Sequence, residues 1–282
     1  MRILKRLAAL LGCLVVIVGV SLFALGRGWH VEDVSPGELS AKLRPHDEIL
    51  KPEGEGPFQT VLIVPGCSGP RADHLEYARD FRRLGFASLI VDSNAHRGLD
   101  PTSGCGLTTM PWPAELAGDV LVSLDHARRL PFVDRERIVL AGWSSGASAI
   151  LDLLAMDLPR DLPTNLASPP GGGLEGVVAV ALFYPNCGLG VREAPGGWAV
   201  KVPSLFLLAG EESRVPGGLE ACVELARRLS AAGQAAATQV YEGVGHAWDI
   251  SDVAPGHTHV HVPEASADSR QQLLAFLAQH SR

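Results

Sequence analysis

Residues 137–151 read Arg-Ile-Val-Leu-Ala-Gly-Trp-Ser-Ser-Gly-Ala-Ser-Ala-Ile-Leu. The apolar stretch 138–141 is typical of a buried strand, and residues 147–156 are good helix formers. Between them stands the G-x-S-x-G pentapeptide of residues 142–146, in the strand–turn–helix context of a nucleophile elbow. Glycines permit so tight a turn, where a side chain would crowd the neighbouring strand or helix. The turn would lift the Ser144 hydroxyl out of the sheet and aim the N–H groups of a helix N-terminus at developing negative charge.

Strand-like and helix-like segments alternate around this elbow from residue 60 to the end of the chain. We predict strands at 48–50, 60–64, 87–91, 138–141, 177–183, 203–208 and 238–241, and helices at 72–84, 114–130, 147–156, 218–229 and 265–280. The alternation predicts an α/β fold with a mostly parallel sheet, because βαβ connections are right-handed crossovers. Three long loops, 92–113, 157–176 and 188–200, are where we expect substrate specificity to reside.

The overall composition favours one large domain. The chain has 282 residues, of which 46% are hydrophobic and 20% are charged. Its net charge of −7 argues against a nucleic-acid partner. We predict three parts: an N-terminal segment 1–26, a polar lead-in 27–56, and the main domain 57–282.

The N-terminal segment has the pattern of a membrane-targeting sequence. Arg2, Lys5 and Arg6 precede an uncharged run at residues 7–26. About 20 apolar residues span a bilayer, and the preceding basic residues place the rest of the chain outside the cytoplasm. We therefore predict an extracytoplasmic protein, on the periplasmic or secreted side, held at the membrane by this run. A cleaved signal peptide that ends near Ala24 and Gly26 is the alternative.

A serine nucleophile needs a base, and His246 is the best-placed candidate. It lies just after the last predicted strand, which satisfies the chain order serine, acid, histidine. The acid that orients the histidine should follow the strand at 203–208, where Glu211 and Glu212 are adjacent. The oxyanion hole should combine the N–H of Ser145 with an N–H from the loop after residues 60–64.

Several motifs in order resemble the dienelactone hydrolase family of α/β-hydrolases, in a serine-bearing branch. The resemblance covers about residues 57–282. The motifs are Pro65-Gly66-Cys67-Ser68-Gly69, Val91-Asp92-Ser93 with Arg97-Gly98-Leu99, Asp119, Gly142-Trp143-Ser144-Ser145-Gly146, Tyr184-Pro185 with Cys187, Gly210-Glu211, and Gly245-His246-Ala247.

The resemblance implies a fold and an activity. The fold would be the α/β-hydrolase fold, a mostly parallel central sheet with helices on both faces. The activity would be that of a serine hydrolase that cleaves an ester or lactone bond of a small molecule through an acyl-enzyme. Ser144 would be the nucleophile, and the amides of Cys67 and Ser145 would form the oxyanion hole. No cofactor is required. An acyltransferase with the same triad, or a non-catalytic envelope protein that keeps the fold for binding, are the rival interpretations.

The chain departs from the family pattern in three places. Pro65 stands where the family usually has histidine, and Ser144 stands where the enzymes that name the family carry cysteine, so dienelactone cleavage itself is not expected. The family's acid is an aspartate in a Gly-x-x-Asp-x-x-x-Pro pattern. Counting forward from Gly210 gives Ser213, and counting back from Pro216 gives Glu212. We favour Glu212 over Glu211 as the acid.

Two residues near the elbow are predicted to bind substrate. Arg97 lies after a strand, on the sheet edge where such folds bind ligands, so it could clamp a carboxylate in bidentate fashion. A structural role for Arg97, in which it binds Asp92 or a loop carbonyl, is the alternative that we favour. Trp143, next to the nucleophile, is the second predicted substrate contact.

Four cysteines lie beyond the N-terminal run, an even number suited to an oxidising compartment. Ordinary buried thiols are the alternative. The family-like positions imply bridges between Cys67 and Cys105 and between Cys187 and Cys222. The sequence His257-Thr258-His259-Val260-His261 could place three imidazoles on one face, but only the distant Glu264 accompanies them. We predict a solvated loop and no metal there.

Overall fold

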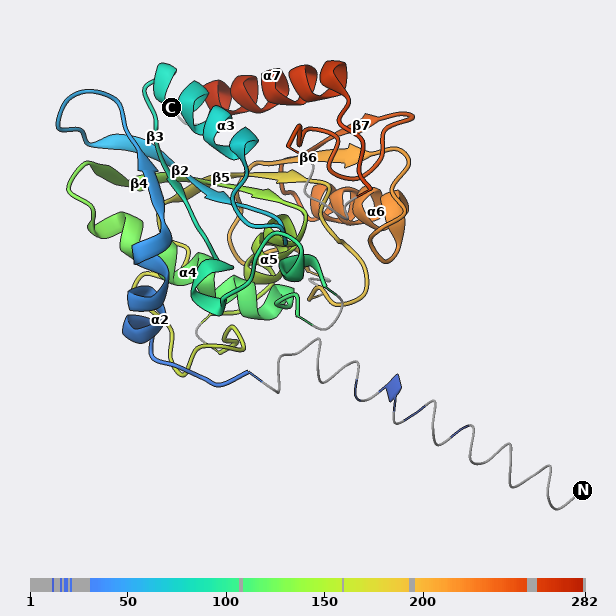
Figure 1. Cartoon of the computed structure of the whole chain (residues 1–282), viewed down its shortest axis with the longest axis horizontal. Coiled ribbons are helices and arrows are strands. Elements are labelled where there is room, and N and C mark those ends of the chain that lie inside the picture. The colour runs from blue at the N-terminus through green and yellow to red at the C-terminus, as the bar shows by residue number, and fades with distance from the viewer. Residues whose placement is uncertain are drawn as a thin grey trace, which may run out of the picture.

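One seven-stranded sheet organises the part of the chain that the structure describes (Figure 1). This computed structural model describes residues 31–280 apart from 107–108, 159, 193–195 and 253–257, together with residues 12, 16, 18, 19 and 21. The strand order is β1-β3-β2-β4-β5-β6-β7. The strands are β1 Glu48–Leu50, β2 Phe58–Val64, β3 Ala87–Ile90, β4 Val133–Trp143, β5 Val177–Phe183, β6 Ser204–Ala209 and β7 Ala236–Tyr241. Only β1 runs antiparallel to its neighbour among these, so the predicted mostly parallel sheet is confirmed.

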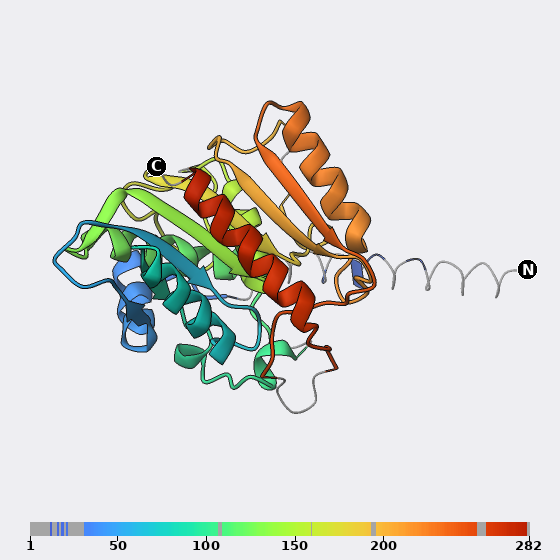
Figure 2. The same cartoon turned by 90° about the horizontal axis from the view of Figure 1, so that it is seen from above.

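Helices cover both faces of the sheet (Figures 1 and 2). One face carries α2 Pro36–Leu43, α4 Pro113–Arg129, α5 Ser145–Leu154 and α6 Gly218–Ala231, and the other carries α3 Ala72–Arg83 and α7 Pro263–His280. Short 3₁₀ turns occur at η1 Arg44–His46, η2 Ala95–Arg97 and η3 Ser103–Cys105. Each face has its own buried apolar cluster, which is why the central strands are apolar on both sides.

The structure extends two elements that flank the elbow. β4 begins at Val133, whereas the sequence predicted a strand only from residue 138. Its first half carries exposed charged residues at 135–137, so hydrophobicity alone did not reveal it. Helix α5 begins at Ser145, two residues earlier than predicted, because the end of the elbow already has helical geometry despite its Ser-Gly sequence.

The predicted polar lead-in contains a helix that the sequence analysis missed. Helix α2 starts with a capping box, in which Ser35 Oγ accepts from the backbone of Glu38 and the Glu38 carboxylate accepts from the Ser35 N–H. Leu39 and Leu43 are buried in the same cluster as α4. The Ser-Pro-Gly-Glu sequence at 35–38 is a helix-start signature that could have identified it. The predicted boundary at residue 57 therefore lies inside one folded unit.

The predicted membrane segment, residues 7–26, lies almost entirely outside the described residues. Within the described part of the chain, no helix combines the length and the apolar character needed to cross a membrane.

Candidate active site

Ser144 occupies a strained turn between β4 and α5. Its φ of 51° and ψ of −118° lie in a region that non-glycine residues rarely adopt. A Cβ on Gly142 would lie 2.7 Å from the Ala147 Cα, and one on Gly146 would lie 2.2 Å from the Val64 carbonyl oxygen. Both glycines of the pentapeptide are therefore required by close packing, as the elbow interpretation predicts. The Ser144 N–H donates to the Phe183 carbonyl at 2.9 Å, which ties the turn to β5.

The structure brings three of the predicted residues into one hydrogen-bonded chain. Ser144 Oγ lies 2.8 Å from His246 Nε2, and His246 Nδ1 lies 2.6 Å from Glu212 Oε2. An ionised carboxylate only accepts, so Nδ1 carries the proton and Nε2 is left to accept from the serine hydroxyl. The side chains of His246 and Glu212 are 10% and 4% exposed. The three side chains follow β4, β7 and β6, at the carboxyl edge of the parallel sheet.

Of the two adjacent glutamates, Glu212 is the one that contacts the histidine. Glu211 is exposed, and its backbone N–H donates to the Val244 carbonyl. Burial would raise the pKa of Glu212, but hydrogen bonds from His246 and from the backbone N–H groups of Arg214 and Val215 hold that pKa below its usual value. The carboxylate is therefore ionised at neutral pH and can stabilise a protonated imidazole.

The loop after β2 lies directly against Ser144. A Cβ on Gly66 would lie 3.1 Å from the Ser144 Cβ, so the backbone itself approaches the serine. Cys67 and Ser145 both line the pocket that contains Ser144. Ser145 is the first residue of α5, where the leading N–H groups have no acceptor within the helix. Both residues therefore lie beside the serine, and their role as an oxyanion hole stays a prediction.

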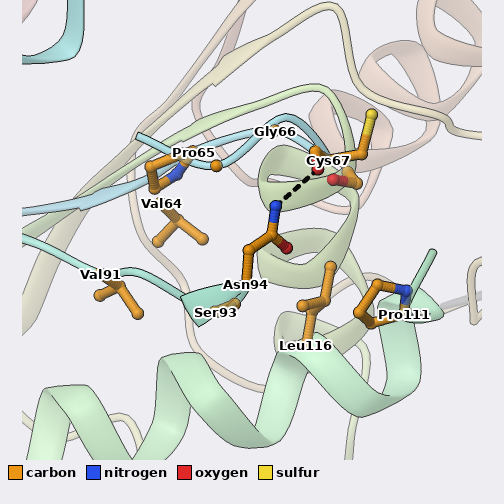
Figure 3. Close-up of a pocket in the computed structure, with 11 residues that line it drawn as sticks. Val64, Pro65, Gly66, Cys67, Val91, Ser93, Asn94, Pro111 and Leu116 are labelled. Atoms are coloured by element: carbon orange, nitrogen blue, oxygen red, sulfur yellow. Dashed lines mark hydrogen bonds between the residues drawn. The ribbon is translucent and has the colours of Figure 1, made fainter. Parts of the chain in front are cut away.

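Asn94 supports this loop from behind, a contact that the sequence analysis did not predict. Its Nδ2 donates to the Cys67 carbonyl at 2.8 Å, and Figure 3 shows it beneath the loop beside a small cavity. Gly66, Leu116 and Pro111 line the same cavity. This hydrogen bond fixes the peptide between Cys67 and Ser68, so Asn94 helps to hold the loop in place beside Ser144.

Both disulfides that the family resemblance implied are present. Cys67 is bonded to Cys105, and Cys187 is bonded to Cys222, with Cα separations of 4.9 and 5.0 Å. The first bridge fastens the loop beside the nucleophile to η3, and both of its cysteines line the pocket. The second joins the segment after β5 to α6 and is not among the residues that line that pocket.

An open pocket of about 650 Å³ lies over Ser144. Most of its wall is apolar, and the residues responsible are Met110, Pro111, Trp112, Leu189, Val215, Pro216 and Ile250. Arg214 also lines the pocket and adds a positively charged side chain to it. The volume and the apolar wall suit a small organic molecule.

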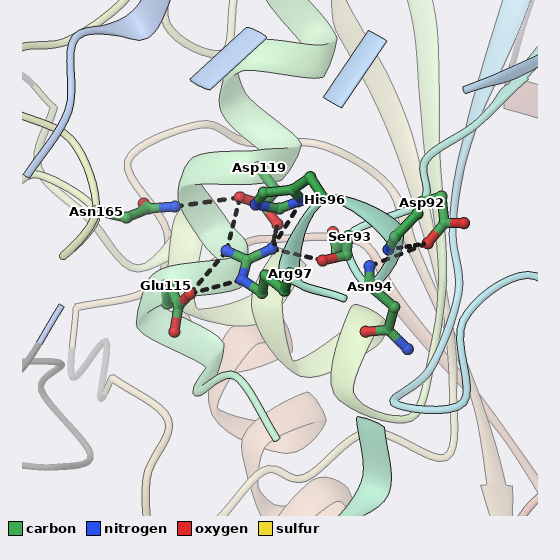
Figure 4. Close-up of polar contacts among 9 residues, drawn as sticks. Asp92, Ser93, Asn94, His96, Arg97, Glu115, Asp119 and Asn165 are labelled. Atoms are coloured by element: carbon green, nitrogen blue, oxygen red, sulfur yellow. Dashed lines mark hydrogen bonds and ion pairs between the residues drawn. The ribbon is translucent and has the colours of Figure 1, made fainter. Parts of the chain in front are cut away.

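Arg97 does not reach this pocket, which corrects its predicted role in substrate binding. Its guanidinium forms ion pairs of 2.7 Å with Asp119 and with Glu115 and also donates to the Ser93 carbonyl (Figure 4). Burial alone would lower the pKa of Arg97, but the two carboxylates raise it above its usual value. The loop-holding alternative is what the geometry shows, although the partners lie on α4 and Asp92 instead accepts from the Asn94 and Ala95 N–H groups.

The Trp143 side chain is also buried and makes its contacts within the protein. It is 1% exposed, it stacks on Phe183 with ring centroids 4.6 Å apart, and its indole N–H donates to Asp249 at 2.8 Å. Trp143 borders the floor of the pocket, but its polar atom cannot serve a substrate. Trp143 can therefore contact a substrate only through its ring, because the indole N–H already has a buried partner.

No group of three or more potential metal ligands occurs among the described residues. His257, the first histidine of the 257–261 sequence, lies outside them.

Solved structures share this architecture. A proposed dienelactone hydrolase from Klebsiella pneumoniae matches with a TM-score of 0.63 and 18% identity, over 83% of this chain and 92% of its own. The chain has the α/β-hydrolase fold. Esterase 2 of Thermogutta terrifontis, phosphoramylated by tabun, matches this hydrolase fold with a TM-score of 0.62 and 15% identity, over 83% and 88% of the two chains.

Sequence similarity to curated proteins covers a smaller part of the chain. The chain is 29% identical to Esterase FrsA of Escherichia coli O1:K1 over 114 residues, which is 39% of this chain. The match spans about a quarter of FrsA, 25% of its length. No family model matches the chain. The resemblance to dienelactone hydrolases and esterases is thus confirmed at the level of the fold.

The two disulfides are expected to act differently on the site. Cys105→Ser and Cys222→Ser should each lower the free energy of unfolding by about 2–4 kcal/mol, because each bridge closes a loop of the unfolded chain. Only Cys105→Ser should also speed backbone hydrogen exchange at residues 65–69, since only that bridge holds the loop beside Ser144. Urea unfolding and hydrogen-exchange mass spectrometry measure both effects. Equal exchange at 65–69 in the two variants would contradict the assignment.

Proposed function

We propose that this α/β-hydrolase cleaves an ester or lactone bond of a small molecule through an acyl-enzyme on Ser144. The observation that carries the proposal is the unbroken chain of hydrogen bonds from Ser144 through His246 to the buried Glu212, which opens onto an apolar pocket. The partial sequence match to Esterase FrsA and the structural match to Thermogutta esterase 2 support the same class of reaction.

The proposed reaction has two halves. His246 Nε2 takes the Ser144 proton as Oγ attacks the carbonyl carbon, and Glu212 stabilises the imidazolium that forms. The amides of Cys67 and Ser145 donate to the oxyanion. Collapse of this intermediate breaks the bond to the alcohol oxygen, which leaves with the proton from His246. Water then gives a proton to His246 as it attacks the acyl carbon. Collapse of this second intermediate breaks the bond to Ser144 Oγ, which takes the proton back from His246 as the acid leaves. These steps use side chains and backbone of this chain and no cofactor.

Two rival functions use parts of the same site. In an acyltransferase, an alcohol replaces water in the second half of the reaction, and product analysis with added alcohols distinguishes the two. A binding protein that merely retains the fold has no need of an aligned relay. The close contacts among Ser144, His246 and Glu212 therefore favour an enzyme.

The roles of Ser144 and His246 predict a large and equal loss of turnover. Ser144→Ala and His246→Ala should each reduce kcat by about 10⁴ to 10⁶ on whichever substrate emerges from an ester library, because the two groups act as a unit. Ser230→Ala, which removes an exposed serine on α6, is the folded control. Near-normal turnover in Ser144→Ala would overturn the proposed mechanism.

The assignment of the acid predicts a difference between neighbouring glutamates. Glu212→Gln should lower kcat by at least about 100-fold, because an amide cannot balance the charge of the imidazolium. Glu211→Gln removes the same charge one residue away, where the side chain is exposed, and should leave kcat nearly unchanged. Steady-state kinetics on both variants measure the contrast. The reverse order would show that Glu211 is the acid.

We also infer that the hydrolase works outside the cytoplasm and that residues 7–26 hold it at a membrane. Two disulfides within the described residues are compatible with an oxidising compartment. The uncharged run with basic residues before it supports the anchor.

Cell fractionation followed by N-terminal sequencing tests this location. We expect the full chain in the membrane fraction, with Arg2 and Lys5 still attached. A soluble protein that begins near Arg27 would mean a cleaved signal peptide and would overturn the anchor but not the compartment. A reduced protein in the cytoplasm would overturn both.

A further inference from the structure

A buried carboxylate lies behind the floor of the active site, and the reaction proposed above does not use it. Asp249 is 1% exposed and accepts three hydrogen bonds from side chains. Trp143 Nε1 lies 2.8 Å and the Tyr77 hydroxyl 3.0 Å from its Oδ2, and the Tyr184 hydroxyl lies 2.6 Å from its Oδ1. All three donors are neutral. Burial raises the pKa of Asp249 above its usual value, so the site is a costly place for a carboxylate.

The donors to Asp249 belong to the elements that hold the relay. Trp143 immediately precedes Ser144 at the end of β4. Tyr184 follows β5, and its ring lies 4.7 Å from the ring of His246. Asp249 itself is three residues after His246 in the same loop. One carboxylate therefore joins the strand that carries the nucleophile, the residue packed against the base, and the loop that carries the base.

Backbone strain in the described residues coincides with this network. The non-glycine residues with positive φ are Ser144 at 51°, Tyr184 at 38° and Ala247 at 59°. Asp249 accepts a hydrogen bond from Trp143, which is the neighbour of Ser144, and another from Tyr184 itself. It also lies two residues after Ala247 in the chain. Strained conformations persist only where surrounding contacts enforce them. Asp249 therefore contacts or adjoins all three strained turns, although it takes no part in the hydrogen-bonded chain of Ser144, His246 and Glu212.

We propose that Asp249 is a positioning residue that sets the relative placement of Ser144 and His246 by fastening Trp143 and Tyr184 to the histidine loop. It touches neither substrate nor the reacting atoms. This inference rests on the proposed function, and it adds to the triad a support whose removal should affect turnover more than substrate binding. Without the carboxylate, Trp143 and Tyr184 would lose their buried acceptor, and the strained turns would lose their common anchor.

The expected effects differ among three variants. Asp249→Leu has a similar shape but no acceptor, so kcat on a p-nitrophenyl ester should fall by about 100-fold while KM changes by less than about threefold. Tyr184→Phe removes one donor and should lower kcat by about tenfold. Asp249→Asn should largely restore turnover, because its oxygen can accept from Trp143 and Tyr77 while its amide donates to a reoriented Tyr184 hydroxyl. Rescue by Asn would identify hydrogen bonding, rather than charge, as the source of the effect.

Ser269→Ala is the matched control. Ser269 is buried and pairs with Trp248 of the same aromatic cluster and with the Tyr77 hydroxyl, but it does not bond to Asp249, so its replacement disturbs the cluster and leaves the carboxylate in place. The control should lose thermal stability with little change in kcat. The proposal is overturned if folded Asp249→Leu keeps kcat within about threefold of the parent, if the loss appears in KM, or if Ser269→Ala loses as much turnover. Should Asp249→Leu fail to fold, an unchanged kcat in Tyr184→Phe overturns the proposal.

Hydrogen exchange separates this inference from the proposed function. If the unmodified protein neither hydrolyses esters nor reacts with a fluorophosphonate, the proposed function fails whatever Asp249 does. Exchange at residues 143–150 and 243–250 should still be faster in Asp249→Leu, or in Tyr184→Phe where the leucine variant does not fold, than in Ser269→Ala. Unchanged exchange there would overturn the positioning role independently of any activity.

Discussion

The conformation of Ser144 is the constraint on which the rest of the site depends. A residue with φ of 51° between a buried strand and a helix places its side chain above the sheet edge. This strained conformation is maintained because Gly142 and Gly146 let α5 and the loop after β2 pack tightly against the turn. The same packing brings the Cys67 loop beside the serine, so the nucleophile and the predicted oxyanion donors are positioned by one set of contacts.

The parallel sheet then determines which residues can meet the serine. Glu212 and His246 follow β6 and β7, whose carboxyl ends share an edge with β4. Around them, cross-links from distant segments hold each loop: the Cys67–Cys105 bridge, the Arg97 ion pairs with α4, and the hydrogen bonds to Asp249. Loops that carry chemistry are thus fixed to rigid elements by contacts that themselves take no part in it.

Local patterns predicted the elbow, the order of strands and helices, and His246. Each of these depends on a short motif or on the periodic spacing of apolar residues, which the sequence shows directly. The choice between Glu211 and Glu212 depends on the conformation of the loop after β6, which the sequence does not define. The prediction of Glu212 rested only on its spacing from Pro216. Arg97 was harder to assign, since its partners lie 18 and 22 residues away on α4. Asp249 was not singled out at all, because its donors come from three separate elements. Helix α2, in contrast, could have been predicted, because residues 35–38 have the sequence of a capping box.

Peptide mapping after reaction with a fluorophosphonate tests the central claim most directly. Fluorophosphonates form a stable adduct on a serine that a neighbouring base activates, and this is the property that the proposal assigns to Ser144. The account predicts one stoichiometric adduct, on Ser144, that does not form when His246 is replaced by alanine. An unmodified Ser144, with no adduct or with the adduct on another residue, would contradict it.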